Sequence, residues 1–140
     1  MKIKYRKNWF RENGDNFEEW FDPNAFKWED GCAFLAFYCQ KYFDQWWDPD
    51  KYNWEYSNIL VRFCSDRFHK WWDPDKYNWE ISNALIAYCT KYIKTWYDPE
   101  KISEEDYELL KLYAMDFIHI WYTPEIFPNK TLKQLQMENL

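Results

Sequence analysis

Apolar side chains recur along the chain at the spacing of an amphipathic helix. Before Trp46 they lie at i, i+3, i+4, i+7, i+8 and i+11, namely Leu35, Tyr38, Cys39, Tyr42, Phe43 and Trp46. This spacing places them on one helical face. The stripe returns at 60–71, 85–96 and 110–121, where it includes Tyr88 and Tyr113. Phe34, Ile59 and Leu109 widen it, which is typical of a helix that packs against neighbours on both sides.

Five tryptophans mark a sequence repeat. They are spaced by 26, 25, 25 and 25 residues: Trp20, Trp46, Trp71, Trp96 and Trp121. An aromatic residue and Asp-Pro follow each of them, except that Thr123 replaces the last Asp. The string WWDPDKYNWE occurs twice, at 46–55 and 71–80, which indicates duplication. The first copy carries one extra residue near Gly31.

The polar residues between the stripes predict where each helix begins. Asp48 suits an N-cap, and Pro49 suits the first helical position because its missing N–H would be unpaired there. We expect a short helical turn at about 49–52. Three N-capping residues then occupy one repeat position: Asn53, Asn78 and Ser103. Long helices of about 17 residues are therefore predicted from near 54, 79 and 104 to the next Trp. The acidic run after Ser103 resembles a capping box.

The sequence thus predicts an all-α fold of tandem helical repeats of about 25 residues, each with a short helical turn and a long helix. Such repeats would form a small α-solenoid-like array in a single domain. The predicted segments are an N-terminal cap at 1–19, four repeats within 20–122 (20–45, 46–70, 71–95 and 96–120), and a partial repeat and cap at 121–140. Parallel and antiparallel stacking both stay open. The Asp-Pro starts and alternating helix lengths resemble leucine-rich-repeat-variant arrays in layout, and the resemblance implies no function.

Both ends of the chain differ from the repeats, as expected of caps. The first segment is polar and offers four aromatic packing anchors: Tyr5, Trp9, Phe10 and Phe17. The last copy breaks at Pro128, and Thr131 is then predicted to cap a short final helix.

Composition supports helices and does not favour a nucleic-acid surface. The 140 residues include 24% aromatics, eleven of them Trp, and two Gly, fewer than sheet-rich folds usually need. The net charge is −6, of which −5 lies in residues 98–122, and no block is strongly basic. The chain has no leader pattern and no run of 18 apolar residues, so we expect a cytoplasmic protein with free cysteines.

Candidate catalytic or metal-ligating residues have structural explanations. Cys39, Cys64 and Cys89 share one repeat position with Ala114, so this position is expected to need a small buried group. Copies 25 residues apart do not form a metal-ligand spacing, and neither a metal nor a cofactor is expected. The Asp-Pro carboxylates are expected to be N-caps. The chain is therefore not expected to be an enzyme.

Two further polar repeat positions are expected to lie in solvent. One holds Asp44, His69, Lys94 and His119, a mixture that indicates a solvated face. The other alternates in sign through Lys41, Asp66, Lys91 and Asp116. If the repeats stack, these residues could form a ladder of ion pairs that fixes the repeat order.

A recurring row of rings and lysines is the candidate partner-binding site. It comprises Trp47, Trp54, Trp72, Trp79, Tyr97, Lys51 and Lys76, and is called the aromatic–lysine row below. The rings could pack between repeats, anchor a protein partner, or stack bases of a single strand or a sugar.

The leading functional hypothesis is a non-catalytic protein-interaction module, since arrays offer large surfaces and no catalytic constellation is evident. A small intracellular inhibitor, such as a phage-encoded blocker of a host defence complex, is one concrete form. The alternative is a single-stranded nucleic-acid-binding helical repeat protein, which the acidic fourth repeat disfavours. An enzyme with an unfamiliar groove site is a third possibility. The identity of the partner and the oligomeric state stay open.

Overall fold

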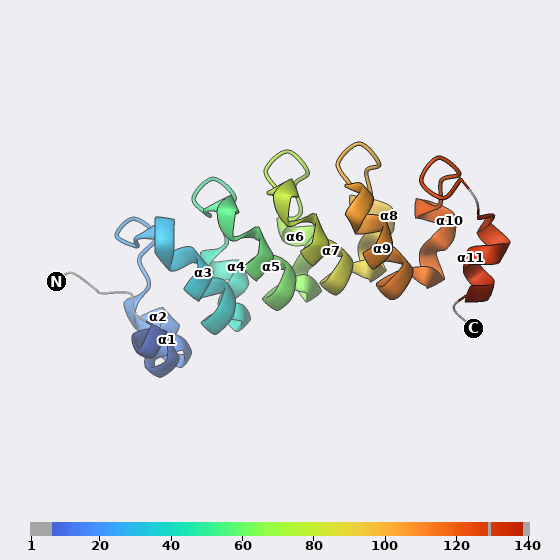
Figure 1. The fold of residues 1–140 in the computed structure, drawn as a ribbon. Coiled ribbons are helices and arrows are strands. Elements are labelled where there is room, and N and C mark those ends of the chain that lie inside the picture. The colour runs from blue at the N-terminus through green and yellow to red at the C-terminus, as the bar shows by residue number, and fades with distance from the viewer. Residues whose placement is uncertain (1–6, 129, 139–140) are drawn as a thin grey trace. The chain divides into compact units, whose positions relative to one another are not determined.

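The chain is all-helical in the computed structural model, which describes residues 7–128 and 130–138 and contains no strand in those ranges (Figure 1). It falls into two compact units, residues 1–78 and 79–140. In the first unit the helices and 3-10 turns are α1 (Lys7–Asn13), η1 (Gly14–Asn16), α2 (Phe17–Trp20), α3 (Trp28–Tyr38), η2 (Gln40–Tyr42), α4 (Phe43–Trp46), η3 (Trp54–Tyr56), α5 (Ser57–Phe63), η4 (Ser65–Arg67) and α6 (Phe68–Trp71).

The second unit contains the same alternation of short elements. These are η5 (Trp79–Ile81), α7 (Ser82–Tyr88), η6 (Thr90–Tyr92), α8 (Ile93–Trp96), α9 (Glu104–Tyr113), η7 (Met115–Phe117), α10 (Ile118–Trp121) and α11 (Leu132–Glu138).

The prediction of one continuous long helix in each sequence repeat is wrong, because one residue interrupts that helix. Cys64 has φ −121° and ψ 25°, between α5 and η4. Its carbonyl accepts the Arg67 amide at 3.0 Å and the indole Nε1 of Trp71 at 2.7 Å. A buried indole therefore takes a carbonyl that a regular helix would pair with the amide four residues later. The same break occurs at Cys39, Cys89 and Ala114.

The predicted N-caps at Asp48, Asn53 and Ser103 are confirmed. The short helical turn expected at about 49–52 is one hydrogen-bonded turn and not a helix. The Asp48 carbonyl accepts the amides of Lys51 and Tyr52 at 3.2 and 3.0 Å, and its carboxylate accepts the Asp50 amide at 2.9 Å. The Asn53 side chain caps η3 through the Glu55 amide. Ser103 and Asp106 form a capping box at the start of α9. These polar contacts set where each helix begins.

Four of the five repeat tryptophans are buried and Trp20 is half-buried, and equivalent repeat positions supply the side chains around them. The buried set includes Leu35, Leu60, Leu85, Leu110, Phe43, Phe68, Ile93, Ile118, Trp46, Trp71, Trp96 and Trp121. The prediction that the stripe also buries Tyr88 and Tyr113 is wrong, since these side chains are 48% and 55% exposed. Each is the last residue of its helix, α7 or α9, and the break that follows ends the helical face.

The helices α3 and α5 of the first unit run in the same direction. The amide of Asn53, just before η3, lies 3.4 Å from Sγ of Cys32, which is early in α3. At the other ends of α3 and α5, the rings of Phe37 and Phe63 have centroids 4.4 Å apart. Start therefore meets start and end meets end for α3 and α5. In the second unit, Ser82 Oγ at the start of α7 donates to Asp106 Oδ2 near the start of α9, at 2.5 Å.

The terminal segments pack as the sequence predicts where they are described. Phe10 and Phe17 are fully buried, and Trp9 contacts Trp20 with ring centroids 4.8 Å apart. Tyr5 lies outside the described residues. Thr131 caps α11 by accepting the Gln134 amide at 3.1 Å.

Candidate functional site

The rings of the aromatic–lysine row are half-buried and pack on one another. Trp47 stacks on Phe43 at 5.2 Å and meets Trp54 edge-on at 5.7 Å. The indole Nε1 of Trp54 donates to the Pro49 carbonyl at 2.9 Å. Trp72 stacks on Phe68 at 5.2 Å, as Trp47 does on Phe43, and Trp79 is half-buried. The faces needed to stack bases are thus partly used within the fold.

The two lysines of the row hold neighbouring turns together. Lys51 Nζ lies 3.4 Å from the Pro23 carbonyl oxygen and 5.9 Å from the centroid of the Trp28 ring. Lys76 Nζ lies 2.8 Å from Asp50 Oδ1, and this hydrogen bond raises the pKa of Lys76 and lowers the pKa of Asp50. Both ammonium groups therefore already have partners that a phosphate would have to replace.

Tyr97, the last ring of the row, lies in the second unit. Its hydroxyl is 2.8 Å from the hydroxyl of Tyr107. Burial, followed by this hydrogen bond, raises the pKa of Tyr97. The pair joins the residue after Trp96 to α9, so Tyr97 acts first as a packing residue.

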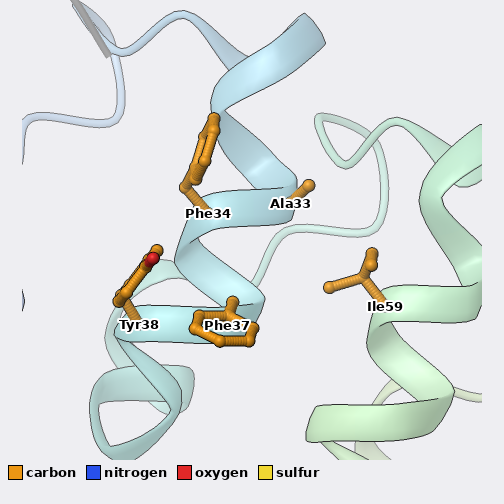
Figure 2. Close-up of a pocket in the computed structure, with 5 residues that line it drawn as sticks. All are labelled: Ala33, Phe34, Phe37, Tyr38 and Ile59. Atoms are coloured by element: carbon orange, nitrogen blue, oxygen red, sulfur yellow. The ribbon is translucent and has the colours of Figure 1, made fainter. Parts of the chain in front are cut away.

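An open apolar pocket lies between α3 and α5, and sequence reasoning missed it as a site. It has a volume of about 210 Å³ and is lined by Ala33, Phe34, Phe37, Tyr38 and Ile59, called the α3–α5 pocket below. In Figure 2, Ile59 points from α5 toward α3, and Ala33 points from α3 toward α5. Phe37 is 42% exposed. No lining residue is ionisable apart from the Tyr38 phenol.

The signal for this pocket in the sequence is weak. Position 37 is aromatic, but the equivalent residues are Arg62, Ala87 and Leu112, so no pattern recurs there. Phe34 and Ile59 fit the packing stripe and do not stand out from it. The pocket forms only where these residues face each other across two helices.

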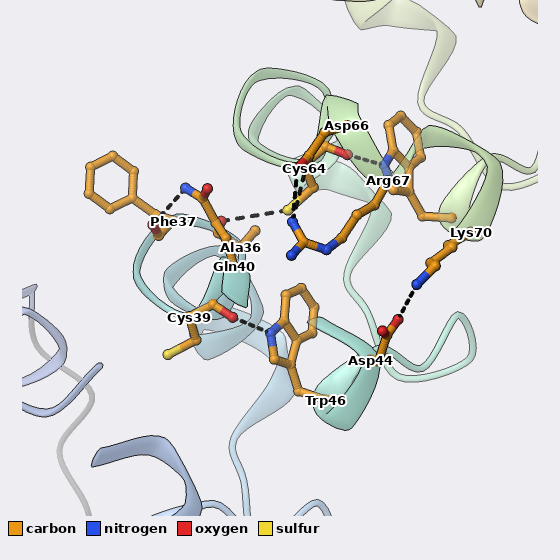
Figure 3. A network of polar contacts seen from close by, with 11 residues as sticks. Ala36, Phe37, Cys39, Gln40, Asp44, Trp46, Cys64, Asp66, Arg67 and Lys70 are labelled. Atoms are coloured by element: carbon orange, nitrogen blue, oxygen red, sulfur yellow. Dashed lines mark hydrogen bonds and ion pairs between the residues drawn. The ribbon is translucent and has the colours of Figure 1, made fainter. Parts of the chain in front are cut away.

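Ion pairs join neighbouring segments, although mostly at other positions than the predicted ladder. Lys41 pairs at 2.9 Å with Asp15, which stands five residues before Trp20 and so shares the repeat position of the ladder, although the ladder as predicted did not include it. Asp66 instead pairs with the adjacent Arg67 at 3.2 Å, which corrects the prediction at that rung. Figure 3 shows Lys70 reaching Asp44, at 2.7 Å.

The four thiols are free and buried. Burial raises the pKa of Cys32 to about 11 and the pKa of Cys39, Cys64 and Cys89 to about 12, so the nucleophilic thiolate is disfavoured. His69 and His119 are exposed, as predicted. In the described ranges, no three His, Cys, Asp or Glu side chains group in a way that could hold a metal ion.

The chain matches no protein-family model, no curated protein and no solved structure. Of the helices in the described residues, none is both long and apolar enough to cross a membrane.

Proposed function

We propose that this chain is a non-catalytic protein-interaction module, and that its repeats stack as a small α-solenoid-like array. The α3–α5 pocket carries the proposal. An open apolar pocket with an exposed aromatic at its mouth suits an apolar side chain of a protein partner, because burying that surface is favourable.

The proposed array is supported by contacts that recur at the repeat spacing. The backbone amide of Asn53 meets Cys32 Sγ, and the amide of Asn78 meets Ser57 Oγ at 3.2 Å. The same repeat positions are thus joined in two successive pairs within the first unit. Four free cysteines are usual in the cytoplasm, which is the proposed location.

The nucleic-acid alternative is less well supported. Lys51 and Lys76 are held by backbone carbonyls, Asp50 and the Trp28 ring. The chain as a whole is acidic, with net charge −6. A single strand would need to displace these internal contacts and overcome this charge.

The test is capture of proteins from the native cells with the tagged full chain and with the Phe37→Ala variant. Phe37 is exposed, so the substitution removes the ring at the pocket without opening the core. A protein captured by the original chain and at least about tenfold depleted with Phe37→Ala is expected, since an interface hot spot contributes about 2 kcal/mol or more.

The matched control is Leu112→Ala, which removes an apolar side chain that is 74% exposed in the second unit. It should capture the same protein in the same amount. Equal depletion by both variants, or capture that is unchanged by Phe37→Ala, would contradict a role for the α3–α5 pocket.

A further inference from the structure

A second pocket lies between the start of α9 and the turn after α10. Its volume is about 380 Å³. Three exposed carboxylates, Glu104, Glu108 and Glu125, stand around an apolar floor of Tyr107, Ile126 and Phe127. We call it the α9 pocket. Tyr107 and Phe127 are buried, at 3% and 8% exposure, so the floor is part of the packed unit.

The pocket is open because two residues differ from the other sequence repeats. Eight residues after Trp20, Trp46 and Trp71 stand Trp28, Trp54 and Trp79, whereas eight residues after Trp96 stands Glu104. Five residues after Trp46 and Trp71 stand Lys51 and Lys76, whereas five residues after Trp121 stands Ile126. In the first unit the lysine covers the tryptophan, with Lys51 Nζ 5.9 Å from the Trp28 ring centroid. A shorter glutamate and an isoleucine cannot make that contact, and they leave space.

The first unit also shows what the equivalent acidic position binds. Asp50, four residues after Trp46, holds the ammonium group of Lys76 at 2.8 Å, and the same Nζ lies 3.4 Å from the Pro49 carbonyl oxygen. Glu125 stands four residues after Trp121, next to Pro124. The lysine that Asp50 binds stands five residues after Trp71, and the residue five after Trp121 is Ile126, so the last copy lacks that lysine.

The charges around the α9 pocket are only partly balanced. Lys111 Nζ lies 3.8 Å from Glu108 and 3.9 Å from Glu138, and 6.0 Å from the centroid of the Phe127 ring. Glu104 and Glu125 form no ion pair within the described residues. The pocket therefore combines two unpaired carboxylates, one shared carboxylate and an apolar floor.

We propose that the α9 pocket binds a lysine or arginine side chain of a protein partner, presented between apolar residues. This rests on the proposed function and names the chemistry of the partner. The carboxylates attract the charged head, and the floor accepts the methylene stem and the flanking apolar side chains. The occupant takes the place of the lysine that Ile126 replaces, beside Glu104, which stands at the position equivalent to Trp28.

The test is an amide NMR titration of the full chain with the capped peptide acetyl-Leu-Lys-Leu-amide. Its probe control replaces the lysine by norleucine, which keeps the stem and removes the charge. Saturable shifts are expected at the start of α9 and in residues 125–128 with the lysine peptide. The paired substitution Glu104→Gln and Glu125→Gln should weaken binding about three- to tenfold, as expected for two exposed charge contacts.

Glu105→Gln is the matched protein control, because Glu105 is exposed in the first turn of α9 but does not line the pocket. It removes one carboxylate charge from the same helical turn as Glu104 and should leave the affinity unchanged. Glu104→Trp restores the ring present at the equivalent positions and should abolish the shifts while the rest of the spectrum is retained.

Equal binding of the norleucine peptide, equal weakening by Glu105→Gln, or no saturable shift with the lysine peptide would overturn the proposal. The titration requires no captured protein. The loss of Phe37-dependent capture and the absence of lysine-peptide binding at the α9 pocket are therefore separate results.

Discussion

The indole of Trp71 donates a hydrogen bond of 2.7 Å to the carbonyl of Cys64, seven residues earlier. The same contact recurs at 2.7–2.8 Å from Trp46 to Cys39, from Trp96 to Cys89 and from Trp121 to Ala114. Trp20 donates to the Asn13 carbonyl in the same way, at 2.8 Å. The tryptophan that defines the sequence repeat therefore also fixes the break in each helical segment.

Trp71→Ala should destabilise the protein by about 3–5 kcal/mol, because it empties a core site and removes the indole donor. Trp71→Phe keeps much of the ring and should cost less, about 1–3 kcal/mol, since the Cys64 carbonyl keeps the Arg67 amide. Urea unfolding measures both. Unchanged stability of Trp71→Ala would show that the packing assignment is wrong.

Asp106→Ala should destabilise the protein by about 2–3 kcal/mol. The Asp106 carboxylate is 5% exposed and accepts both the Ser82 hydroxyl, at 2.5 Å, and the Ser103 amide, at 3.1 Å. Both donors would lose their acceptor. Asp116→Ala removes an exposed carboxylate of the same unit and should change stability by less than about 0.5 kcal/mol. Similar losses for the two variants in urea unfolding would refute the buried cap.

Stability should fall as the pH rises above about 9. Burial raises the pKa of the Cys39, Cys64 and Cys89 thiols from 9.0 to about 12. The stabilisation from keeping these thiols neutral is complete below pH 9 and is lost as the pH approaches 12, because unfolding then releases their protons. The triple Cys→Ala variant, which places at these positions the residue found at Ala114, should show a smaller loss between about pH 8 and about pH 10.5 in urea unfolding. An equal loss in both proteins would exclude the thiols as its source.

His69→Ala should leave stability within about 0.5 kcal/mol of the original chain, because His69 is exposed beside Phe68. Thermal unfolding at neutral pH is the measurement. A loss of several degrees in midpoint would mean that this face is not solvated as described.

Sequence reasoning identifies the residues that recur. It fails where the backbone angles of a single residue decide whether a helix continues. The burial of Trp46 and its equivalents and the Asp-Pro caps follow from spacing and capping chemistry. The helix break at Cys64 cannot be predicted in this way, because a residue with φ −121° leaves nearly the same pattern of apolar positions as a residue in a regular helix.

Both pockets escape prediction because each depends on which residues face one another. Phe37 has no aromatic counterpart in the other repeats, so recurrence could not reveal it. The α9 pocket arises from the combined loss of a tryptophan, at Glu104, and a lysine, at Ile126. Each change is visible in the sequence, but their proximity is not.

Capture with the tagged full chain from native cells, split into nuclease-treated and untreated halves, tests the protein-interaction proposal most directly. Mass spectrometry of both halves should identify the same protein in stoichiometric amount, because the proposed contact needs no nucleic acid. Recovery of nucleic acid, with the accompanying proteins lost after nuclease treatment, would contradict the proposal. It would favour the alternative in which the aromatic–lysine row binds a single-stranded nucleic acid.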